Sequence, residues 1–302
     1  MKRRWINFTS VFFTVATGVA CLALTAMVAL ILGNVVRHGM AHLSWAFLTQ
    51  APKSGMTEGG IFPAIFGTAA LVLLMTLAAV PLGVSTAIYL QEYAPKGSRW
   101  VHVIRLAIQN LAGVPAIVFG LFGLGFFIQF VGRGLDAAFF HGTLYFGQPA
   151  ILWAALTLAL LTLPTVVVST EEALRVVPQS HREVAYSLGA TRWQMVRHVL
   201  LPQAVGGILT GTILAVSRGA GEVAPILFTG AAYFLPYLPT RLNHQFMELG
   251  YHVYVMATQS PDVDATLPIL YATVFVLLAL TFALNFTAII IRSKIRRRLR
   301  GR

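Results

Sequence analysis

The chain has 302 residues, of which 57% are hydrophobic and only 11% are charged, and it carries a formal net charge of +12. A soluble domain carries about 25% charged residues, so this composition excludes an ordinary soluble protein. Together with a mean hydropathy of +0.75, it indicates a protein embedded in a membrane.

Six apolar runs are long enough to cross a bilayer, which takes about 20 helical residues each. Because these runs are continuous rather than alternating, and because backbone polar groups in lipid must be bonded within each segment, helices are favoured over a β-barrel. The sequence predicts an all-α polytopic membrane protein with six transmembrane helices. The predicted spans are Phe8 to Gly33, Ile61 to Leu90, Leu106 to Val131, Ala150 to Thr170, Ala204 to Thr229 and Leu267 to Ile291.

The first span follows a short basic start but is longer than the hydrophobic region of a secretory signal, which has roughly 7 to 15 residues. No clear cleavage site follows it, so we expect a retained membrane anchor. Cys21 lies inside this span without a lipobox before it, which predicts a buried, inert thiol, and a single cysteine excludes a disulfide within the chain. His38 and His42 lie one helical turn apart, but two histidines make an incomplete site, and no bound metal is expected.

Prolines interrupt three neighbouring spans: Pro115 in the third, Pro164 in the fourth and Pro225 in the fifth. Each removes a backbone N–H and frees a carbonyl one turn back, which then needs a side chain or water. Any one of them could be only a structural kink. Their occurrence in three neighbouring spans favours helix breaks around a polar seam.

Basic residues indicate the orientation, since they are retained on the cytoplasmic side of a membrane protein. With six spans, seventeen Lys and Arg residues fall on the side of both termini and four fall on the other side. This imbalance predicts that both termini and the loop between the fourth and fifth spans are cytoplasmic. The run Arg296-Arg297-Arg298 is typical of an anchor against anionic membrane lipid rather than of a nucleic-acid site.

The cytoplasmic loop from Ser180 to Pro202 has the spacing of ordered structure. Ser180 with Glu183, and Thr191 with Gln194, each match the capping box of a helix start. Between them, Gly189 stands where a first short helix would end in a left-handed residue, and Pro202 is expected to close the second helix. The loop therefore predicts a helix, a sharp turn and a second helix at the membrane surface.

Arg218 and Glu222 are charged residues inside the fifth span. They are four apart and are expected to project from nearly the same helix face. Arg218 would lie roughly 21 Å from Ala204 along the axis, deep in the bilayer, where an ionised group marks a transport pathway by default. An internal ion pair that fixes helix packing is the alternative. Gly219 and Gly221 would open space beside the charges.

Enzyme motifs are missing from the sequence: it has no P-loop, no nucleophile elbow and no zinc-binding H-E-x-x-H pair. Gly120, Gly123 and Gly125 lie in an apolar run, where they are expected to allow close helix packing rather than to bind a nucleotide. The chain is therefore expected not to be an enzyme.

The loop carries a family resemblance. Glu183-Val184-Ala185, Gly189 and Val199-Leu200-Leu201-Pro202 match the E-A-A-x3-G-x9-I-x-L-P signature of ABC importer permeases, with departures at Val184 and Val199. Segments 111–123 and 208–230 resemble more narrowly the PstA-type permeases of phosphate importers, although Val223 stands where that family usually has threonine. The resemblance covers about residues 61–291.

The resemblance implies a type I ABC importer permease fold (MetI-like) with one extra helix before a five-helix core, in a bacterial inner membrane. It divides the chain into an N-terminal part (1–60), the core (61–291) with a cytoplasmic coupling loop (171–203), and a basic tail (292–302). The implied partners are a PstC-like permease, two cytoplasmic ATPase subunits that bind ATP and magnesium, and an extracytoplasmic phosphate-binding protein. This chain itself would bind no cofactor. The outward loops 34–60 and 230–266 are candidates for docking the binding protein.

In such permeases the loop couples to the ATPase, and here Gly189 would permit its turn. An inward-moving phosphate would meet Arg218 on the translocation path. The resemblance leaves open a permease for sulfate, molybdate, phosphonate or an amino acid, and a transporter or channel driven by an ion gradient is a competitor from another class. The expected contacts with the ATPase are apolar ones from Val184, Ala185, Leu188, Met195, Val196 and Val199 and polar ones from Arg182, Glu183 and Arg192.

Overall fold

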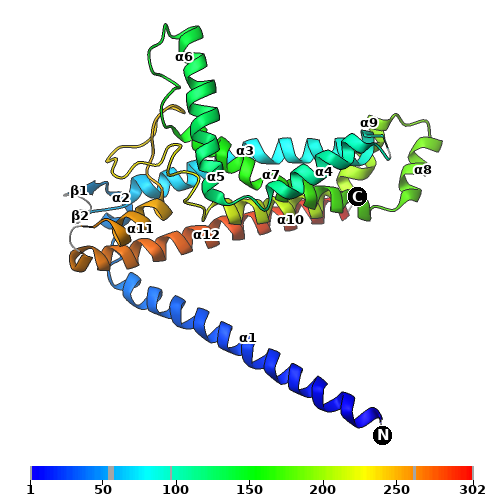
Figure 1. The fold of residues 1–302 in the computed structure, drawn as a ribbon, viewed down its shortest axis with the longest axis horizontal. Helices are drawn as coiled ribbons and strands as arrows, with labels where there is room; N and C mark the ends of the chain where they lie inside the picture. Colours follow the sequence, from blue (N-terminus) through cyan, green and yellow to red (C-terminus); the bar gives the residue numbers. More distant parts are fainter. Residues whose placement is uncertain (1, 54–57, 96, 261–262, 301–302) are drawn as a thin grey trace.

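The computed structural model describes residues 2–53, 58–95, 97–260 and 263–300, which form the elongated helical assembly of Figure 1. Among these residues, six helices are long and apolar enough to cross a membrane, so the predicted all-α class and number of spans are confirmed. The spans are Thr9–Ala41, Phe62–Tyr93, Ala116–Phe139, Ile151–Val176, Arg192–Gly219 and Thr266–Ile295.

Most of the secondary structure is α-helical, with three wider π-helical segments (η2 to η4) and one short antiparallel hairpin. In chain order the elements are α1 (Lys2–Ala41), α2 (Trp45–Thr49), β1 (Pro52–Lys53), β2 (Glu58–Gly59), α3 (Phe62–Ile88), η2 (Tyr89–Tyr93), α4 (Arg99–Leu111), α5 (Ala116–Phe122), η3 (Gly123–Gly132), α6 (Arg133–Phe139), α7 (Ile151–Val176), α8 (Gln179–Ser187), α9 (Arg192–Met195), η4 (Val196–Leu200), α10 (Leu201–Gly219), α11 (Leu249–Thr258) and α12 (Val263–Arg300). In the hairpin, Pro52 lies opposite Gly59.

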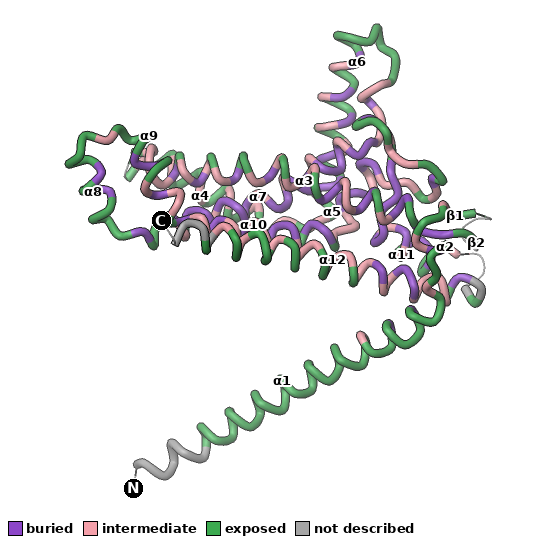
Figure 2. Tube along the Cα trace, turned by 180° about the vertical axis from the view of Figure 1, so that it is seen from behind, coloured by how far each residue is buried: buried purple, intermediate pink, exposed green. Residues whose placement is uncertain are grey.

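Helix α7 is the centre of the core and packs against both α3 and α10. Met75 of α3, Leu158 of α7 and Val216 of α10 belong to one continuous apolar cluster. In Figure 2 the buried residues are concentrated along these three helices. Small residues make the close packing possible: a Cβ at Gly83 of α3 would lie 2.6 Å from a methyl group of Val166 of α7.

Helix α7 continues through Pro164, so the expected break there is wrong. A proline inside a helix costs about 3 kcal/mol because it removes one hydrogen bond and crowds the preceding turn. Pro164 is buried, and the packing of α3 and α10 on either side holds the helix together. The hydroxyl of Thr162 donates to the carbonyl of Leu158 at 2.9 Å, and this adds a side-chain hydrogen bond to the part of the helix that precedes the proline.

The third span is shorter than predicted, because the chain breaks at Pro115. Helix α4 ends at Leu111, and α5 begins directly after Pro115, which is its N-cap. The expected break at this proline is therefore confirmed. No residue of α4 is buried.

Two of the three glycines in this span confirm the expected close packing. A Cβ at Gly120 would lie 3.0 Å from the carbonyl oxygen of Pro225, and one at Gly123 would clash with Thr157. A Cβ at Gly125 would have no neighbour within 4 Å, so the expected close packing is wrong at that position within this chain.

Helix α1 runs away from the bundle and contacts it near its C-terminal end (Figures 1 and 2). There it meets α12: a Cβ at Gly39 would lie 2.7 Å from the carbonyl oxygen of Tyr271, and Asn34 donates to the Tyr271 hydroxyl at 3.4 Å. Cys21 lies on the part that diverges and is exposed, so the expected buried thiol is wrong. A helix that crosses lipid without protein neighbours has no interior in which to bury it.

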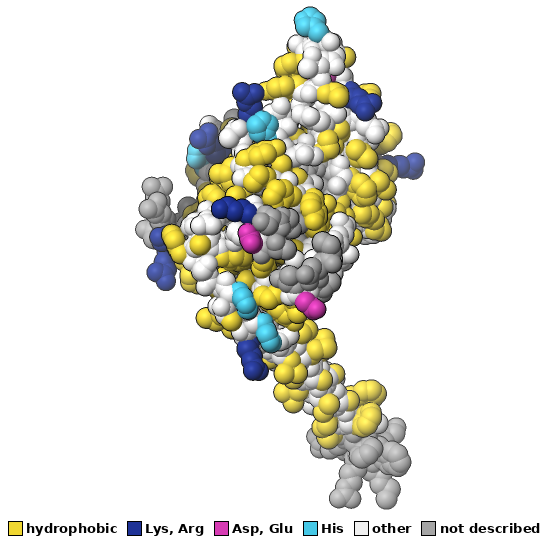
Figure 3. All heavy atoms as spheres, turned by 90° about the vertical axis from the view of Figure 1, so that its left-hand side faces the viewer, with side chains coloured by type: hydrophobic (Ala, Val, Ile, Leu, Met, Phe, Trp, Pro, Cys, Tyr) yellow, Lys and Arg dark blue, Asp and Glu magenta, His cyan; other side chains and the backbone are white. Residues whose placement is uncertain are grey.

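The two ends of the bundle differ in structure. The hairpin, α2 and α11 lie at one end, and α8, α9 and the C-terminus lie at the other (Figure 1). Figure 3 looks onto the first end, where charged side chains are scattered among hydrophobic ones. The loops expected to face outward therefore lie opposite the coupling loop, as the predicted topology requires.

The contact between α3 and the chain before α11 can be tested at Gly67. A Cβ at Gly67 would clash with the carbonyl oxygen of Met247, so Gly67→Ala is expected to destabilise the protein by about 1 to 3 kcal/mol, as overpacking does. The measurement is thermal unfolding of the purified protein in detergent. Gly206→Ala is the control, because nothing lies within 4 Å of that site. Equal melting temperatures for the two variants would contradict the packing described here.

Candidate coupling and translocation site

The first helix of the coupling loop, α8, begins two residues earlier than the sequence suggests. Its N-cap is Pro178, and no side chain caps it. Proline disfavours helical backbone in the residue before it, so α7 ends at Val176 and a new helix starts directly after the proline. Ser180 therefore lies inside the first turn, and the expected capping box with Glu183 is wrong.

The turn between α8 and α9 has the expected form. Gly189 has a φ of +78°, in the left-handed region. The N–H of Ala190 donates to the carbonyl of Ala185 at 3.0 Å, and that of Gly189 donates to Tyr186 at 2.9 Å. This is the bonding of a Schellman motif, which satisfies the last carbonyls of the helix.

The capping box at the start of α9 is confirmed. The N–H of Gln194 donates to the Thr191 hydroxyl at 3.3 Å, and the N–H of Thr191 donates to the Gln194 side chain at 2.8 Å. Both bonds satisfy N–H groups that a helix start leaves without intrahelical partners.

Pro202 does not close a helix, so this expectation is wrong. Helix α9, η4 and α10 form one continuous helix from Arg192 to Gly219. Just before the proline, the N–H of Leu201 donates to the carbonyl of Val196, five residues back. The wider π-helical turn accommodates the proline without ending the helix. The coupling loop is thus joined without interruption to the helix that carries Arg218.

Several residues expected to contact the ATPase are buried within this chain instead. Ala185, Met195 and Val196 pack with Leu174 and Leu200 in an apolar cluster that fixes the loop to the bundle. They are not available to a partner, and the expectation is wrong for them.

The apolar part of the exposed surface of α8, α9 and the turn between them is formed by four large residues. We call it the loop face. It consists of Val184, Tyr186, Leu188 and Trp193, which are 59%, 45%, 83% and 55% exposed. The sequence reasoning named Val184 and Leu188 but missed the two aromatic residues. Glu183 is exposed beside them, whereas Val199 is half-buried.

Arg182 was expected at the polar rim of the ATPase contact, but it is buried. Its guanidinium pairs with Glu92 of η2, with Nη2 to Oε1 at 2.9 Å, and the two side chains are only 10% and 8% exposed. It also donates to the carbonyls of Leu174 and Val177 at 2.9 and 2.8 Å. Arg192 is exposed, with its guanidinium 5.6 Å from the centre of the Tyr93 ring.

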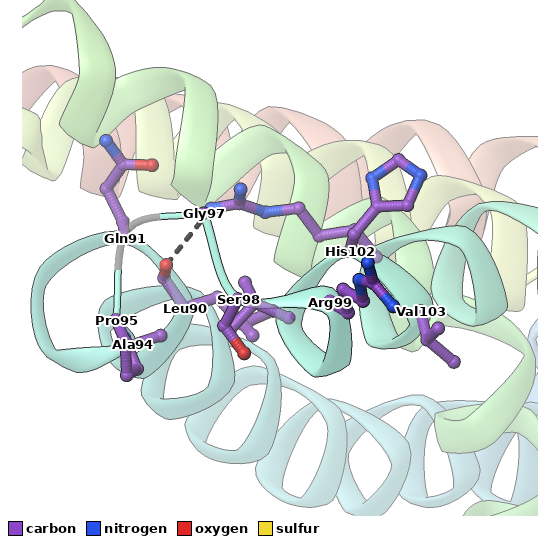
Figure 4. A pocket seen from close by; sticks show the side chains of 11 residues that line it. Leu90, Gln91, Ala94, Pro95, Gly97, Ser98, Arg99, His102 and Val103 are labelled. Atoms are coloured by element: carbon purple, nitrogen blue, oxygen red, sulfur yellow. Dashed lines mark hydrogen bonds between the residues drawn. The ribbon is translucent and has the colours of Figure 1, made fainter.

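A second arginine-carboxylate pair lies close by, and Figure 4 shows the hydrogen bond that its arginine makes with Leu90. Nε of Arg105 on α4 lies 3.1 Å from Oε1 of Glu171 on α7, and Nη2 donates to the carbonyl of Leu90 at 3.0 Å. Arg105 and Leu90 line a cavity of about 790 Å³, together with Arg99 and His102. No sequence pattern indicated either pair, because the partners are far apart along the chain.

Arg218 and Glu222 are close in space but do not share a helix. Helix α10 ends at Gly219, and Glu222 lies in the turn that follows, with its Oε1 3.7 Å from Nε of Arg218. The Arg218 side chain is 42% exposed, so the pair is not sealed inside the protein. Pro225 lies beyond the end of the helix and does not break it.

Of the two glycines beside these charges, only Gly221 has the expected open space around it. A Cβ at Gly219 would clash with the sulfur of Met75 on α3, so this glycine permits close packing rather than open space. Gly221 lies outside the helix and meets nothing within 4 Å. The residue next to Arg218 is thus in direct contact with α3.

The sequence reasoning did not identify a buried polar cluster near the N-terminal end of α3. Glu248 caps α11 by accepting from the N–H groups of Gly250 and Tyr251, and it also accepts from the Thr68 hydroxyl. Burial raises the pKa of the Glu248 carboxyl, although these bonds oppose the shift. Burial also lowers the pKa of His252 to about 4. The cluster fixes α11 to α3.

Metal ligation finds no support in the described part of the chain, where no group of three or more His, Cys, Asp or Glu side chains is placed to hold an ion. The ring nitrogens of His38 and His42 lie near backbone carbonyl oxygens, those of Asn34 and His38 respectively.

Comparison with known proteins gives the class of the chain. The family described as binding-protein-dependent transport system inner membrane component matches residues 79–301. A probable ABC transporter permease protein, YqgI of Bacillus subtilis, is 32% identical over 83% of this chain and 85% of its own length. The chain therefore belongs to this family of permeases.

Within the family, the chain is similar to proteins named phosphate transport system permease protein PstA. The PstA of Xylella fastidiosa (strain 9a5c) is 33% identical over 87% of this chain and 85% of its own length. The PstA of Yersinia pestis is 38% identical over 66% of this chain and 62% of its own length.

Solved structures confirm the fold. A chain of the MetNI methionine ABC transporter superposes with a TM-score of 0.58 at 16% identity, over 77% of this chain and 94% of that one. A chain of a bacterial alginate ABC importer has a TM-score of 0.65 at 18% identity, over 91% and 94%. The predicted type I ABC importer permease fold is thus confirmed.

The capping assignments can be tested by hydrogen exchange. Thr191→Ala removes the acceptor for the Gln194 N–H, and losing an N-cap costs about 1 kcal/mol, so exchange in the first turn of α9 is expected to speed up about fivefold. Ser180→Ala, at a residue that caps nothing, is the control. A faster first turn of α8 in the Ser180 variant would contradict the placement of the α8 start at Pro178.

Proposed function

We propose that the chain is a permease subunit of an ATP-driven phosphate importer and that it forms half of the translocation pathway. The observation that carries this proposal is the uninterrupted helix from Arg192 in the coupling loop to Gly219, next to Arg218. Because this helix is continuous, a movement of the coupling loop also displaces Arg218. The similarity to several PstA proteins supports phosphate as the substrate.

Arg218 has the chemistry for a transient phosphate contact. A guanidinium stays charged and offers a forked set of donors to an oxyanion. Its only ion-pair partner among the described residues is Glu222, at a long 3.7 Å, and its side chain is 42% exposed. An arriving anion can therefore take the place of the carboxylate. Glu222 can in turn accept from a protonated phosphate oxygen, which would favour phosphate over the fully ionised sulfate.

The partners follow from the loop face and from the family. The exposed Leu188 and Trp193 would dock into a cytoplasmic ATPase, present in two copies, which binds ATP and magnesium and hydrolyses the nucleotide in place of this chain. A PstC-like permease would supply the second half of the pathway, and an extracytoplasmic phosphate-binding protein would deliver the anion. A related alginate importer was solved with its periplasmic protein, which supports this last partner.

In this proposal the protein lies in a bacterial inner membrane with both termini in the cytoplasm. The excess of basic residues on the side of the termini and the coupling loop supports this orientation. Both chain ends and α8 also extend toward the same side of the bundle in Figure 1.

The pathway role of Arg218 predicts a transport defect. Arg218→Gln keeps a polar side chain but shortens it and removes its charge, and phosphate uptake by the assembled transporter is expected to fall at least about tenfold. Uptake of radiolabelled phosphate into cells measures this, with competing sulfate as a test of selectivity. The control is Arg241→Gln, at an exposed arginine in the opposite loop. Normal uptake by the Arg218 variant would remove this residue from the pathway.

The loop face predicts a defect in assembly. Leu188→Asp puts a charge at the most exposed apolar residue of the loop face, and co-purification of the ATPase is expected to fall about tenfold or more, as it does when a central contact is lost. The control is Leu144→Asp, at a leucine that is 61% exposed and outside the loop. If both variants retain the ATPase equally, the loop face is not the docking surface.

A further inference from the structure

The Arg182–Glu92 pair joins two segments that are remote in sequence. Arg182 lies on α8, in the coupling loop, and Glu92 lies on η2, at the cytoplasmic end of α3. Both oxygens of Glu92 accept from the guanidinium, at 2.9 and 3.4 Å. The remaining arginine bonds go to two backbone carbonyls at the end of α7 and just beyond it.

A buried ion pair of this kind is weak evidence for stability, because desolvating two charges offsets most of their attraction. Its effect on the relative position of the two segments is clear. A buried charge without its partner costs free energy, so the two segments move together when either one moves. The pair therefore ties the displacement of α8 to that of η2.

Two more contacts attach η2 to its surroundings. Arg192 of α9 lies over the ring of Tyr93, at 5.6 Å from its centre. From the other side, Arg105 of α4 donates to the Leu90 carbonyl at 3.0 Å (Figure 4). The coupling loop thus contacts η2 at two points, one from each of its helices, whereas Arg105 connects η2 to elements outside the loop.

The η2 segment continues α3 as a single span, Phe62–Tyr93. Near the middle of this span, the sulfur of Met75 packs against Gly219, the residue after Arg218. Near its far end, Thr68 bonds the carboxylate that caps α11. Helix α3 therefore runs from the coupling loop, past the charged residue of the pathway, to the loop at the opposite end of the bundle.

We propose that Arg182 and Glu92 are positioning residues that transmit the movement of the coupling loop to α3. This inference rests on the proposed function and adds a second route to it. The first route is the covalent one along α10, which ends at Arg218. The second passes through the ion pair and α3 and meets the first where Met75 contacts Gly219. Correct placement of Arg218 needs both helices to move together.

The test compares two carboxylates with matched chemistry. Glu92→Gln breaks the pair that reaches α8, and Glu171→Gln breaks the neighbouring pair between α4 and α7. Both are measured in the complete transporter in proteoliposomes, where phosphate uptake and ATP hydrolysis are recorded together. The readout is the number of ATP molecules hydrolysed per phosphate imported.

For Glu92→Gln this ratio is expected to rise about tenfold, because hydrolysis continues while misalignment of the pathway slows transport. For Glu171→Gln it is expected to change less than about twofold, since the Arg105–Glu171 pair joins α4 to α7 and does not reach α8 or α9. A merely structural role of Glu92 would lower both activities in proportion and leave the ratio unchanged, which would overturn the proposal.

A cross-link provides the second arm, measured on the assembled fraction. In a Cys21→Ser background, Glu92→Cys and Arg182→Cys are combined, and a short thiol-reactive cross-linker is added. The linkage is expected to bring the raised ratio back to within about twofold of the wild type, because a covalent bridge replaces the ion pair as a mechanical tie. A ratio that stays high after complete cross-linking would overturn the proposal.

Failure of the inference differs from failure of the proposed function. If the wild-type transporter hydrolyses ATP without importing phosphate, the proposed function is wrong. If the wild type imports phosphate normally and Glu92→Gln does so with the same ratio, only the second route is wrong.

Discussion

The structure depends on one constraint: the helix that leaves the coupling loop passes Pro202 without ending. A proline in the interior of an ordinary α-helix crowds the turn before it. Here the turn before Pro202 is π-helical, with the Leu201 N–H bonded five residues back, and the helix continues to Gly219. If the helix ended at the proline, the loop and Arg218 would lie on separate bodies joined by a flexible connection. Because the helix does not end there, the coupling loop and Arg218 belong to one rigid body.

The three prolines that were expected to break helices lie in different surroundings. Pro164 is buried between two helices, and α7 passes through it unbroken. Pro115 is exposed at the end of a helix without buried residues, and there the chain does break. Pro225 follows a helix that has already ended. Packing alone does not decide the outcome, because α3 also continues through Pro81, which is exposed.

Charged groups also have two distinct uses in this protein. Arg182 and Glu92 are buried and fully bonded, which suits a fixed joint between segments. Arg218 and Glu222 are closer in sequence but more exposed and more loosely paired, which suits a group that exchanges partners with a passing anion. Nothing in the local sequence distinguishes the two pairs. Burial and the number of bonds do so.

Local patterns in the sequence determined the class of the protein, the six spans, the left-handed turn at Gly189 and the capping box at Thr191. These features depend on hydrophobic run length and on bonds between residues a few positions apart. The start of α8 was local too, but the effect of Pro178 outweighed that of Ser180. Only the tertiary structure decided that Arg182, Ala185 and Met195 face inward, that the helix survives Pro202, and that α3 contacts both the coupling loop and the residue beside Arg218. Those outcomes depend on which helices pack together, and such contacts join residues that are tens of positions apart and leave no periodic signal along the chain.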